Sequence, residues 1–204
     1  MLEAQHLAAQ RGGVPLFAEV AFALRRGEAL VVTGANGSGK TTLLRMVAGL
    51  TLPAAGNLAW NGAAVTPFDP SLRGTTLYIG HATALKDELS AEENLASLAS
   101  LHGANVDNAR TRAALAEWAL ERQRSLPARV LSQGQRRRVG LARLRLIRRP
   151  LWVLDEPTTA LDSAGVATLQ TFIAAHLAQG GVAVIATHHD LDLPLGATKA
   201  LTLS

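Results

Sequence analysis

The sequence contains no cysteine and few aromatic residues. The absence of cysteine from its 204 residues excludes disulfides and thiolate metal sites, and it suits a reducing compartment. Aromatic residues make up 4% and hydrophobic residues 48%, so Leu, Val, Ile and Ala must fill the core.

No apolar run approaches the roughly 20 residues that a membrane-spanning helix needs. The first residues, with Glu3 among them, have no basic stretch before an apolar run. We therefore expect no secretory signal and a soluble protein on the cytosolic side.

The charge is modestly positive, with 20 basic and 16 acidic residues and a net charge of +4. Arginines cluster after residue 135, which raises the question of a nucleic-acid partner: Arg136, Arg137, Arg138, Arg143, Arg145, Arg148 and Arg149. Nucleic-acid grooves combine such charge with aromatic stacking residues, and none are interleaved here. Charged runs of this kind are usually solvated helix faces. We therefore expect no nucleic-acid partner.

Short apolar segments alternate with helical patterns along the chain. Three of them are typical of buried strands: 29–33, 151–154 and 182–186. Helical patterns cover 41–50, 108–124, 132–149 and 163–179, and Ser90 with Glu93 forms a predicted capping box. Alternation of this kind predicts an α/β fold with a parallel sheet. The apolar positions of 14–24 alternate in places, which favours strands near the N-terminus.

The segment after the first buried strand matches the P-loop pattern G-x-x-x-x-G-K-[ST]. Its residues, and the threonine that follows, are Gly34, Ala35, Asn36, Gly37, Ser38, Gly39, Lys40, Thr41 and Thr42. Glycines allow backbone N–H groups to surround a phosphate, and the helix that follows adds its positive N-terminal end. Lys40 is expected to reach the β- and γ-phosphates of ATP, and Thr41 to bind Mg²⁺.

Two carboxylates follow the buried strand 151–154. Asp155 occupies the position of a Walker B aspartate, which would contribute to the Mg²⁺ site. Glu156 comes next and could polarise the attacking water as a general base. The alternative is a solvated acidic pair at a strand end, and the P-loop upstream favours the catalytic interpretation.

Three further segments suggest which class of P-loop protein this is. Leu131-Ser-Gln-Gly-Gln135 resembles the ABC signature Leu-Ser-Gly-Gly-Gln, with Gln133 in place of the first glycine. Taken alone, Ser132 to Gln135 also fits an ordinary helix N-cap. Thr159-Ala-Leu-Asp162 resembles the D-loop, and Thr187-His188 resembles the switch histidine at the end of the last buried strand. A P-loop kinase would explain neither the signature nor the histidine.

The chain thus resembles the ATPase subunits of ABC transporters over essentially its whole length. The resemblance implies an α/β fold with a P-loop NTPase core, a helical subdomain insert and an N-terminal antiparallel β piece. It implies one domain, with 1–87 and 149–204 as the catalytic core and about 88–148 as the helical subdomain. It also implies that Ser132, Gly134, Gln135 and Asp162 contact the nucleotide of a second ATPase subunit in a head-to-tail homodimer. Glu156 and His188 would then act in catalysis together with Lys40.

At a finer level the chain is similar to the ATP-binding subunits of haem exporters in the cytochrome c maturation system. This resemblance rests on Leu77-Tyr-Ile-Gly-His81, Leu101-His-Gly103 and the segment 131–139. It places His81 where most relatives have the Q-loop glutamine that approaches the metal. It places Arg11 where many relatives stack an aromatic ring on adenine. Arg11 could lie flat on adenine or be an ordinary surface arginine.

The finer resemblance also implies where the protein works. Its partners would be the membrane permease subunits of a haem exporter complex, which would contact the segment from Thr83 to Lys86. The subunit would be peripheral, on the cytoplasmic face of the bacterial inner membrane. Two alternatives stay open: an ATPase of another ABC exporter, for lipid, lipoprotein or drug, and a soluble ABC protein acting on ribosomes or DNA. The latter usually carries two cassettes or a long coiled insert, and this sequence has neither.

Overall fold

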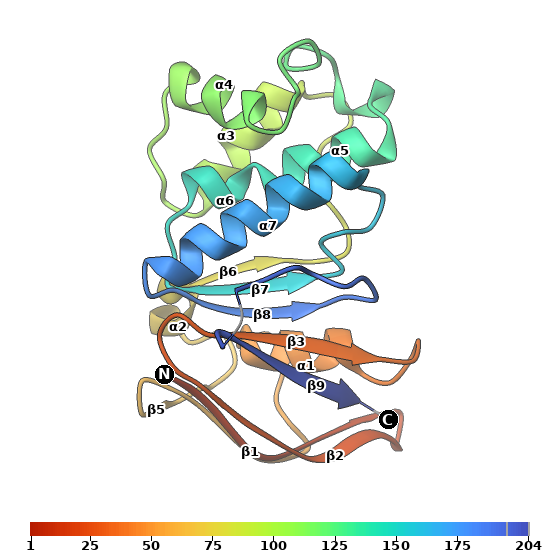
Figure 1. Ribbon diagram of the computed structural model, residues 1–204, viewed down its shortest axis with the longest axis vertical. Helices are drawn as coiled ribbons and strands as arrows, with labels where there is room; N and C mark the ends of the chain where they lie inside the picture. The colour runs from red at the N-terminus through yellow and green to blue at the C-terminus, as the bar shows by residue number, and fades with distance from the viewer. Residues whose placement is uncertain (195, 204) are drawn as a thin grey trace. The chain divides into compact units, whose positions relative to one another are not determined.

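The computed structural model describes residues 1–194 and 196–203, and the chain forms two compact units. Unit 1 comprises Met1–Tyr78, Arg149–Glu156 and Ile173–Ser204, and unit 2 comprises Ile79–Arg148 and Pro157–Phe172. Figure 1 shows the elements of each unit in the colours of the chain order. Within the described residues, 1–194 and 196–203, no helix is both long and apolar enough to cross a membrane.

Unit 1 contains an antiparallel sheet. Its strand order is β2-β1-β4-β5, with β1 at Leu2–Arg11, β2 at Val14–Leu24, β4 at Ala55–Trp60 and β5 at Ala63–Ala64. Two-residue turns join the hairpins: Gly12-Gly13 and Asn61-Gly62 all have positive φ, as type I′ turns require. The predicted N-terminal antiparallel β piece is confirmed, although β1 itself was not predicted.

The second sheet of unit 1 carries the buried strands. Its order is β6-β7-β8-β3-β9, with β6 at Thr76–Ile79, β7 at Leu151–Asp155, β8 at Val182–Ala186, β3 at Ala29–Gly34 and β9 at Thr198–Leu203. β3 pairs in parallel with β8 and with β9, and β7 pairs in parallel with β8. Every residue of β7 and β8 is buried, as expected for inner parallel strands. The prediction of a parallel sheet is confirmed.

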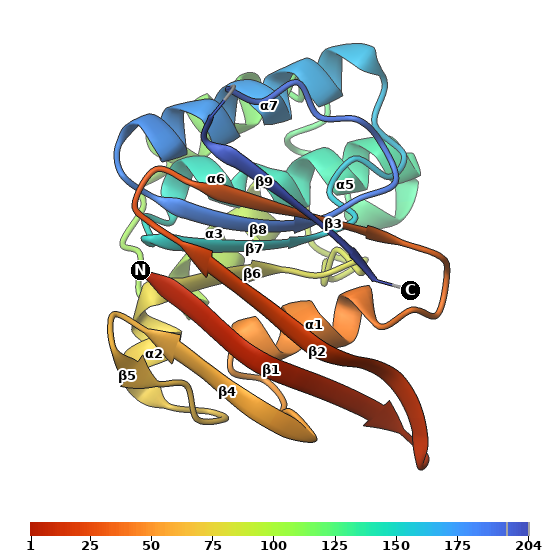
Figure 2. The ribbon, with the colours of Figure 1, turned by 60° about the horizontal axis from the view of Figure 1, so that its bottom comes forward.

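Helix α1, at Lys40–Val47, joins the two sheets into one core. Its apolar residues pack in a cluster with Leu7 of β1 and Val184 of β8, and Figure 2 shows the helix between the two sheets. A short helix, α2, spans Pro70–Thr75. This core fixes the start of α1, where the P-loop ends.

Unit 2 is helical. It contains α3 at Ala91–Leu101, α4 at Asn108–Ala116, the 3₁₀ turn η1 at Ala128–Val130, α5 at Gln133–Leu141, α6 at Arg143–Leu146 and the first part of α7 at Ser163–Ala178. The predicted capping box is confirmed at α3, because Ser90 Oγ accepts from the Glu93 amide and Glu93 Oε2 accepts from the Ser90 amide.

Two predicted helices are shorter than expected. The helix predicted at 108–124 ends at Ala116, and Ala119 takes a left-handed conformation with φ 55°. This turn allows both Trp118 and Leu120 to be buried, although residues two apart face different sides of a helix. The helix predicted at 132–149 divides into α5 and α6 and ends at Leu146. At the break between α5 and α6, the Nε of Arg143 donates to the Gly140 carbonyl. In a continuous helix this carbonyl would accept from the backbone amide four residues later.

Candidate functional site

Two of the three P-loop glycines, Gly34 and Gly39, are required by close packing in unit 1. A Cβ on Gly34 would lie 2.4 Å from the Leu203 carbonyl oxygen, and one on Gly39 would lie 2.8 Å from the ring of Phe17. Both glycines also have positive φ, 143° and 97°, where side chains are strained. The loop therefore holds one shape because β2 and β9 pack against it.

The lysine of the loop is buried and directed back at the loop. Lys40 is 8% exposed, and its Nζ donates to the carbonyls of Gly34 at 2.8 Å and Ala35 at 3.0 Å. The first helical bond of α1 runs from the Leu43 amide to Gly39. Glycine offers no side-chain cap, so the N–H groups that begin α1 remain available to an anion.

One buried hydroxyl of the loop, that of Ser38, suits a phosphate ligand. Ser38 Oγ is buried and finds no hydrogen-bond partner among the described residues. Protein interiors rarely leave such a group unsatisfied. A phosphate oxygen bound by the loop would supply the acceptor, so the loop fits a nucleotide phosphate.

A buried carboxylate ends strand β7. Asp155 is 1% exposed and lies close to Tyr78 of β6. Burial, then the charge of Asp155, raises the pKa of Tyr78 above its ordinary value, while Arg45 of α1 acts in the opposite direction. The sequence does not predict that Tyr78 contacts Asp155, or that Arg45 contacts Tyr78. The quoted segment 77–81 contains Tyr78, but no local pattern links it to a strand so far along the chain.

Glu156 and His188 lie side by side in unit 1. The distance between His188 Nε2 and Glu156 Oε1 is 3.3 Å. Glu156 has a left-handed backbone, with φ 49°, and its amide donates to the Ala186 carbonyl of β8. Such a conformation is uncommon outside glycine and is often found at functional sites. Two of the three predicted catalytic residues, Glu156 and His188, thus lie together at the carboxyl ends of neighbouring parallel strands.

The signature segment begins helix α5 in unit 2. Ser132 Oγ accepts from the Gln135 amide at 3.2 Å, and Gln135 Oε1 accepts from the Ser132 amide at 3.0 Å, which makes a capping box. The side chains of Ser132 and Gln135 therefore satisfy each other's backbone. A Cβ on Gly134 would lie 2.7 Å from the Ala160 carbonyl oxygen, so glycine is needed where the 157–162 segment passes over α5.

Asp162 is held by partners inside unit 2. Its carboxylate accepts two bonds from Arg138 Nη2, at 2.5 and 2.6 Å, and one from the Gly165 amide at the start of α7. The bond from Gly165, and then the one from Arg138, keeps the pKa of Asp162 below its ordinary value. The predicted nucleotide-contact residue is therefore also the cap of α7.

Two predicted ligands, His81 and Arg11, are exposed. His81 lies in unit 2 after β6, and its carbonyl accepts from Arg137 at 3.2 Å. Arg11 ends β1 in unit 1 and is paired in register with Val14. Within 1–194 and 196–203 there is no group of three or more His, Cys, Asp or Glu side chains able to hold a metal ion.

Comparisons with known proteins agree with this geometry. The family model described as ABC transporter matches residues 17–159. The "Cytochrome c biogenesis ATP-binding export protein" of Aromatoleum aromaticum is 50% identical over 97% of this chain and 93% of its own length. The protein of the same name from Paramagnetospirillum magneticum is 47% identical over 94% of this chain and 89% of its own length.

Solved structures share the fold. A putative ABC transporter ATP-binding protein from Pyrococcus furiosus has a TM-score of 0.84 at 24% identity, over 99% of this chain and 96% of its own. A dimeric ATP-binding cassette in a post-hydrolysis state, bound to ADP and Pi, has a TM-score of 0.77 at 23% identity, over 93% and 88%. The chain therefore belongs to the ABC transporter family and, within it, to the cytochrome c biogenesis ATP-binding export proteins.

Proposed function

We propose that this chain is the ATP-hydrolysing subunit of an ABC transporter complex that exports haem, or releases it to its carrier, in c-type cytochrome biogenesis. The observation that carries the proposal is the identity of 43–50% over nearly the full length with proteins named for cytochrome c biogenesis and export. The pairing of Glu156 with His188, in the unit that contains the P-loop, supplies the chemistry such a subunit needs.

In this proposal, different residues of unit 1 bind the phosphates of ATP and the Mg²⁺ ion. Lys40 and the N–H groups that begin α1 bind the phosphates, and the hydroxyl of Thr41 and the carboxylate of Asp155 would hold Mg²⁺. When bound, Mg²⁺ neutralises charge on the transferred phosphoryl group. Both groups offer oxygen atoms, which Mg²⁺ prefers. The metal contact expected of His81 stays a prediction: its imidazole offers nitrogen, whereas Mg²⁺ prefers oxygen.

Glu156 is the proposed general base. Its carboxylate accepts the proton of the attacking water, and His188 at 3.3 Å holds the carboxylate in place. The left-handed backbone of Glu156 fixes the direction of the side chain before substrate arrives.

Arg11 is proposed to lie against the adenine through its guanidinium plane.

A second copy of the chain completes the site in this proposal. Ser132, Gly134, Gln135 and Asp162 contact the nucleotide bound by the partner copy in a head-to-tail homodimer, where the start of α5 adds a second positive helix end. ATP binding closes this two-subunit sandwich, and hydrolysis reopens it, as a shift between two populated states. Residues 1–87 and 149–204 form the catalytic core of one ABC ATPase domain, and residues about 88–148 form its helical subdomain.

The membrane partners are proposed to be the permease subunits of the haem exporter. They would receive the segment Thr83 to Lys86, in which Lys86 is exposed. The subunit would then be peripheral, on the cytoplasmic face of the bacterial inner membrane.

The test is deletion of the gene in its source organism, followed by staining of membrane proteins for covalently bound haem. We expect all c-type cytochromes to be lost, to return with the wild-type gene, and to stay absent with Glu156→Gln. Normal cytochromes in the deletion strain would overturn the haem role and favour the ATPase of another ABC exporter. Restoration by Glu156→Gln would show that hydrolysis is not required.

A further inference from the structure

The three consecutive arginines of α5 each hold a different part of unit 2. Successive residues of a helix point about 100° apart, so Arg136, Arg137 and Arg138 face three directions. The sequence suggested a solvated run, and the structure instead gives each guanidinium its own set of loop partners. The helix that carries the signature serine is thus tied to the loops around it.

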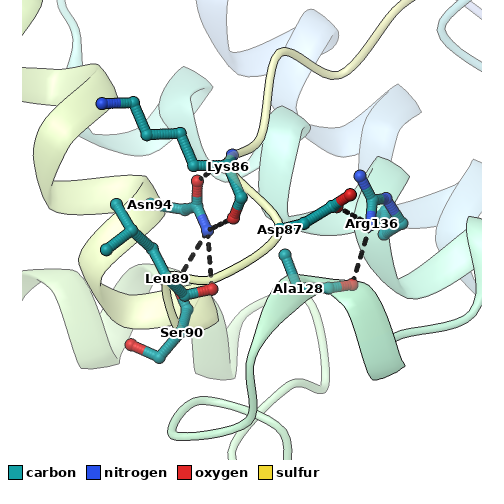
Figure 3. A network of polar contacts seen from close by, with 7 residues as sticks. All are labelled: Lys86, Asp87, Leu89, Ser90, Asn94, Ala128 and Arg136. Carbon is teal, nitrogen blue, oxygen red and sulfur yellow. Dashed lines mark hydrogen bonds and ion pairs between the residues drawn. The ribbon is translucent and has the colours of Figure 1, made fainter.

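Arg136 holds the exposed segment that precedes α3. Its Nη1 donates to Asp87 Oδ1 at 2.6 Å and to the Ala128 carbonyl at 2.9 Å. Asn94, 2% exposed, holds the same segment from α3. Figure 3 shows its amide nitrogen donating to the carbonyls of Lys86, Leu89 and Ser90. These bonds hold the segment in one shape, and the Arg136–Asp87 ion pair joins it to α5.

Arg137 differs from its neighbours because it is buried. It is 3% exposed, and its guanidinium spans two loops. Nη1 donates to the carbonyls of Gly80 at 2.9 Å and His81 at 3.2 Å, and Nε donates to the Pro157 carbonyl at 3.2 Å. These loops are far apart in sequence and both belong to unit 2. One follows β6, and the other directly follows Glu156.

The chemistry of this contact needs arginine. Burying a cation is costly, and an apolar residue of similar size often stabilises a fold equally well. A planar fork of several N–H groups can reach carbonyls on two loops at once, whereas lysine has one nitrogen and glutamine a shorter side chain. The burial of Arg137 is therefore better explained by the two loops it joins than by packing alone.

We propose that Arg137 is a positioning residue that couples the loop at Gly80–His81 to the loop after Glu156. A displacement of the segment 80–87 moves the guanidinium, and through it the carbonyl of Pro157, next in the chain to the general base. Arg138, bound to Asp162, holds the far end of the same 157–162 loop to α5. The inference rests on the proposed function, in which a membrane partner contacts the segment Thr83 to Lys86.

The test compares Arg137→Gln and Arg137→Lys with wild type and with a matched control, Arg145→Gln. Arg145 is an exposed arginine of the same unit, paired with Glu117 at 2.9 Å, and the control makes the same change of charge. Hydrogen exchange of the full chain, read by mass spectrometry, reports on the loops without nucleotide. ATP turnover of the complex assembled with its membrane partner reports on the coupling.

In Arg137→Gln we expect amides in both 80–87 and 157–162 to exchange about tenfold faster, while α4 and the control stay at wild-type rates. In the complex, kcat should fall about tenfold with KM for ATP unchanged, because the P-loop lies outside unit 2. Arg137→Lys has one nitrogen, so it should protect only one of the two segments, which keeps the test informative if the glutamine variant does not fold.

Wild-type exchange in either segment of Arg137→Gln, wild-type protection of both segments in Arg137→Lys, or an unchanged kcat would overturn the coupling. These results are separable from a failure of the proposed function. If the wild-type complex does not hydrolyse ATP, the proposed function is wrong, and the exchange measurement still decides whether Arg137 joins the two loops.

Discussion

Glu156 combines a strained backbone with a chemical role. Its φ of 49° costs free energy for a residue with a side chain, and strand β8 maintains it through the Ala186 carbonyl. In Glu156→Gln the amide keeps the shape of the side chain but cannot accept a proton. We expect ATP to bind normally while hydrolysis by the assembled complex falls about 10²- to 10⁴-fold, the usual contribution of a general base.

Phosphate release under saturating ATP measures the effect on Glu156→Gln, and Glu117→Gln serves as the control. Glu117 is another glutamate, in unit 2, whose known partner is Arg145, so its turnover should match wild type. Turnover of Glu156→Gln at the wild-type rate would remove Glu156 from the catalytic role and leave the P-loop assignment standing.

Gly134 tests the packing around the signature segment. A Cβ there would lie 2.7 Å from the Ala160 carbonyl oxygen, and a backbone atom cannot move aside easily. We expect Gly134→Ala to lower the free energy of unfolding by about 1–3 kcal/mol, as overpacking does, measured by urea denaturation. The matched control is Gly74→Ala in α2, where a new Cβ meets nothing within 4 Å. Equal stability of the two variants would contradict this account.

At the scale of elements, the sequence predicted what local patterns determine. Strands β3, β7 and β8 and the capping box of α3 are correct because burial and capping depend on neighbouring residues. Strand β9 was missed because most of its residues are exposed and it is defined by pairing with β3. The 108–124 helix was predicted too long because burial of Trp118 against Phe172, a tertiary contact, favours a turn.

In the candidate site too, features set by neighbouring residues were predicted, and features set by tertiary contacts were not. The P-loop and Asp155-Glu156 are recognisable because their chemistry lies in contiguous residues. The partners of Arg137 and the need for glycine at position 134 were not predicted, since both depend on loops that are distant in sequence.

Helix α7 and strand β7 meet through a stacked pair that should respond to pH. The rings of Trp152 and His176 lie 3.9 Å apart at an interplanar angle of 3°, and a Cβ on Gly181 would touch the histidine ring. Burial lowers the pKa of His176, while bonds to backbone carbonyls oppose the shift. The folded state therefore binds this proton less readily than the unfolded state, whose pKa is about 6.5.

Because the folded pKa is the lower one, stability from His176 is fully present above about pH 6.5 and is lost as pH falls below it. The slope from this one group can reach about 1.4 kcal/mol per pH unit. We expect His176→Phe, which keeps an aromatic ring, to flatten the dependence of unfolding free energy on pH below about pH 6.5. Measurements between pH 7 and 8 provide the internal control, since the histidine is neutral there in both states. An unchanged acid slope in the variant would rule out His176 as its source.

At the scale of the whole molecule, the phosphate-binding end of α1 belongs to unit 1 and the signature end of α5 to unit 2. The proposed homodimer joins each of these helix ends to the other copy through ATP.

Glu156→Gln binds ATP without hydrolysing it, so with Mg²⁺ and ATP it should elute at twice the mass of one chain in size exclusion with light scattering. Lys40→Ala loses the cation that holds the phosphates and should stay monomeric with ATP. Ser132→Arg should bind ATP yet also stay monomeric, because an added cation at the start of α5 opposes its positive helix end and fills the space for the partner's phosphate. Dimerisation of Ser132→Arg to the same extent as Glu156→Gln would exclude the head-to-tail arrangement while leaving ATP binding by the P-loop intact.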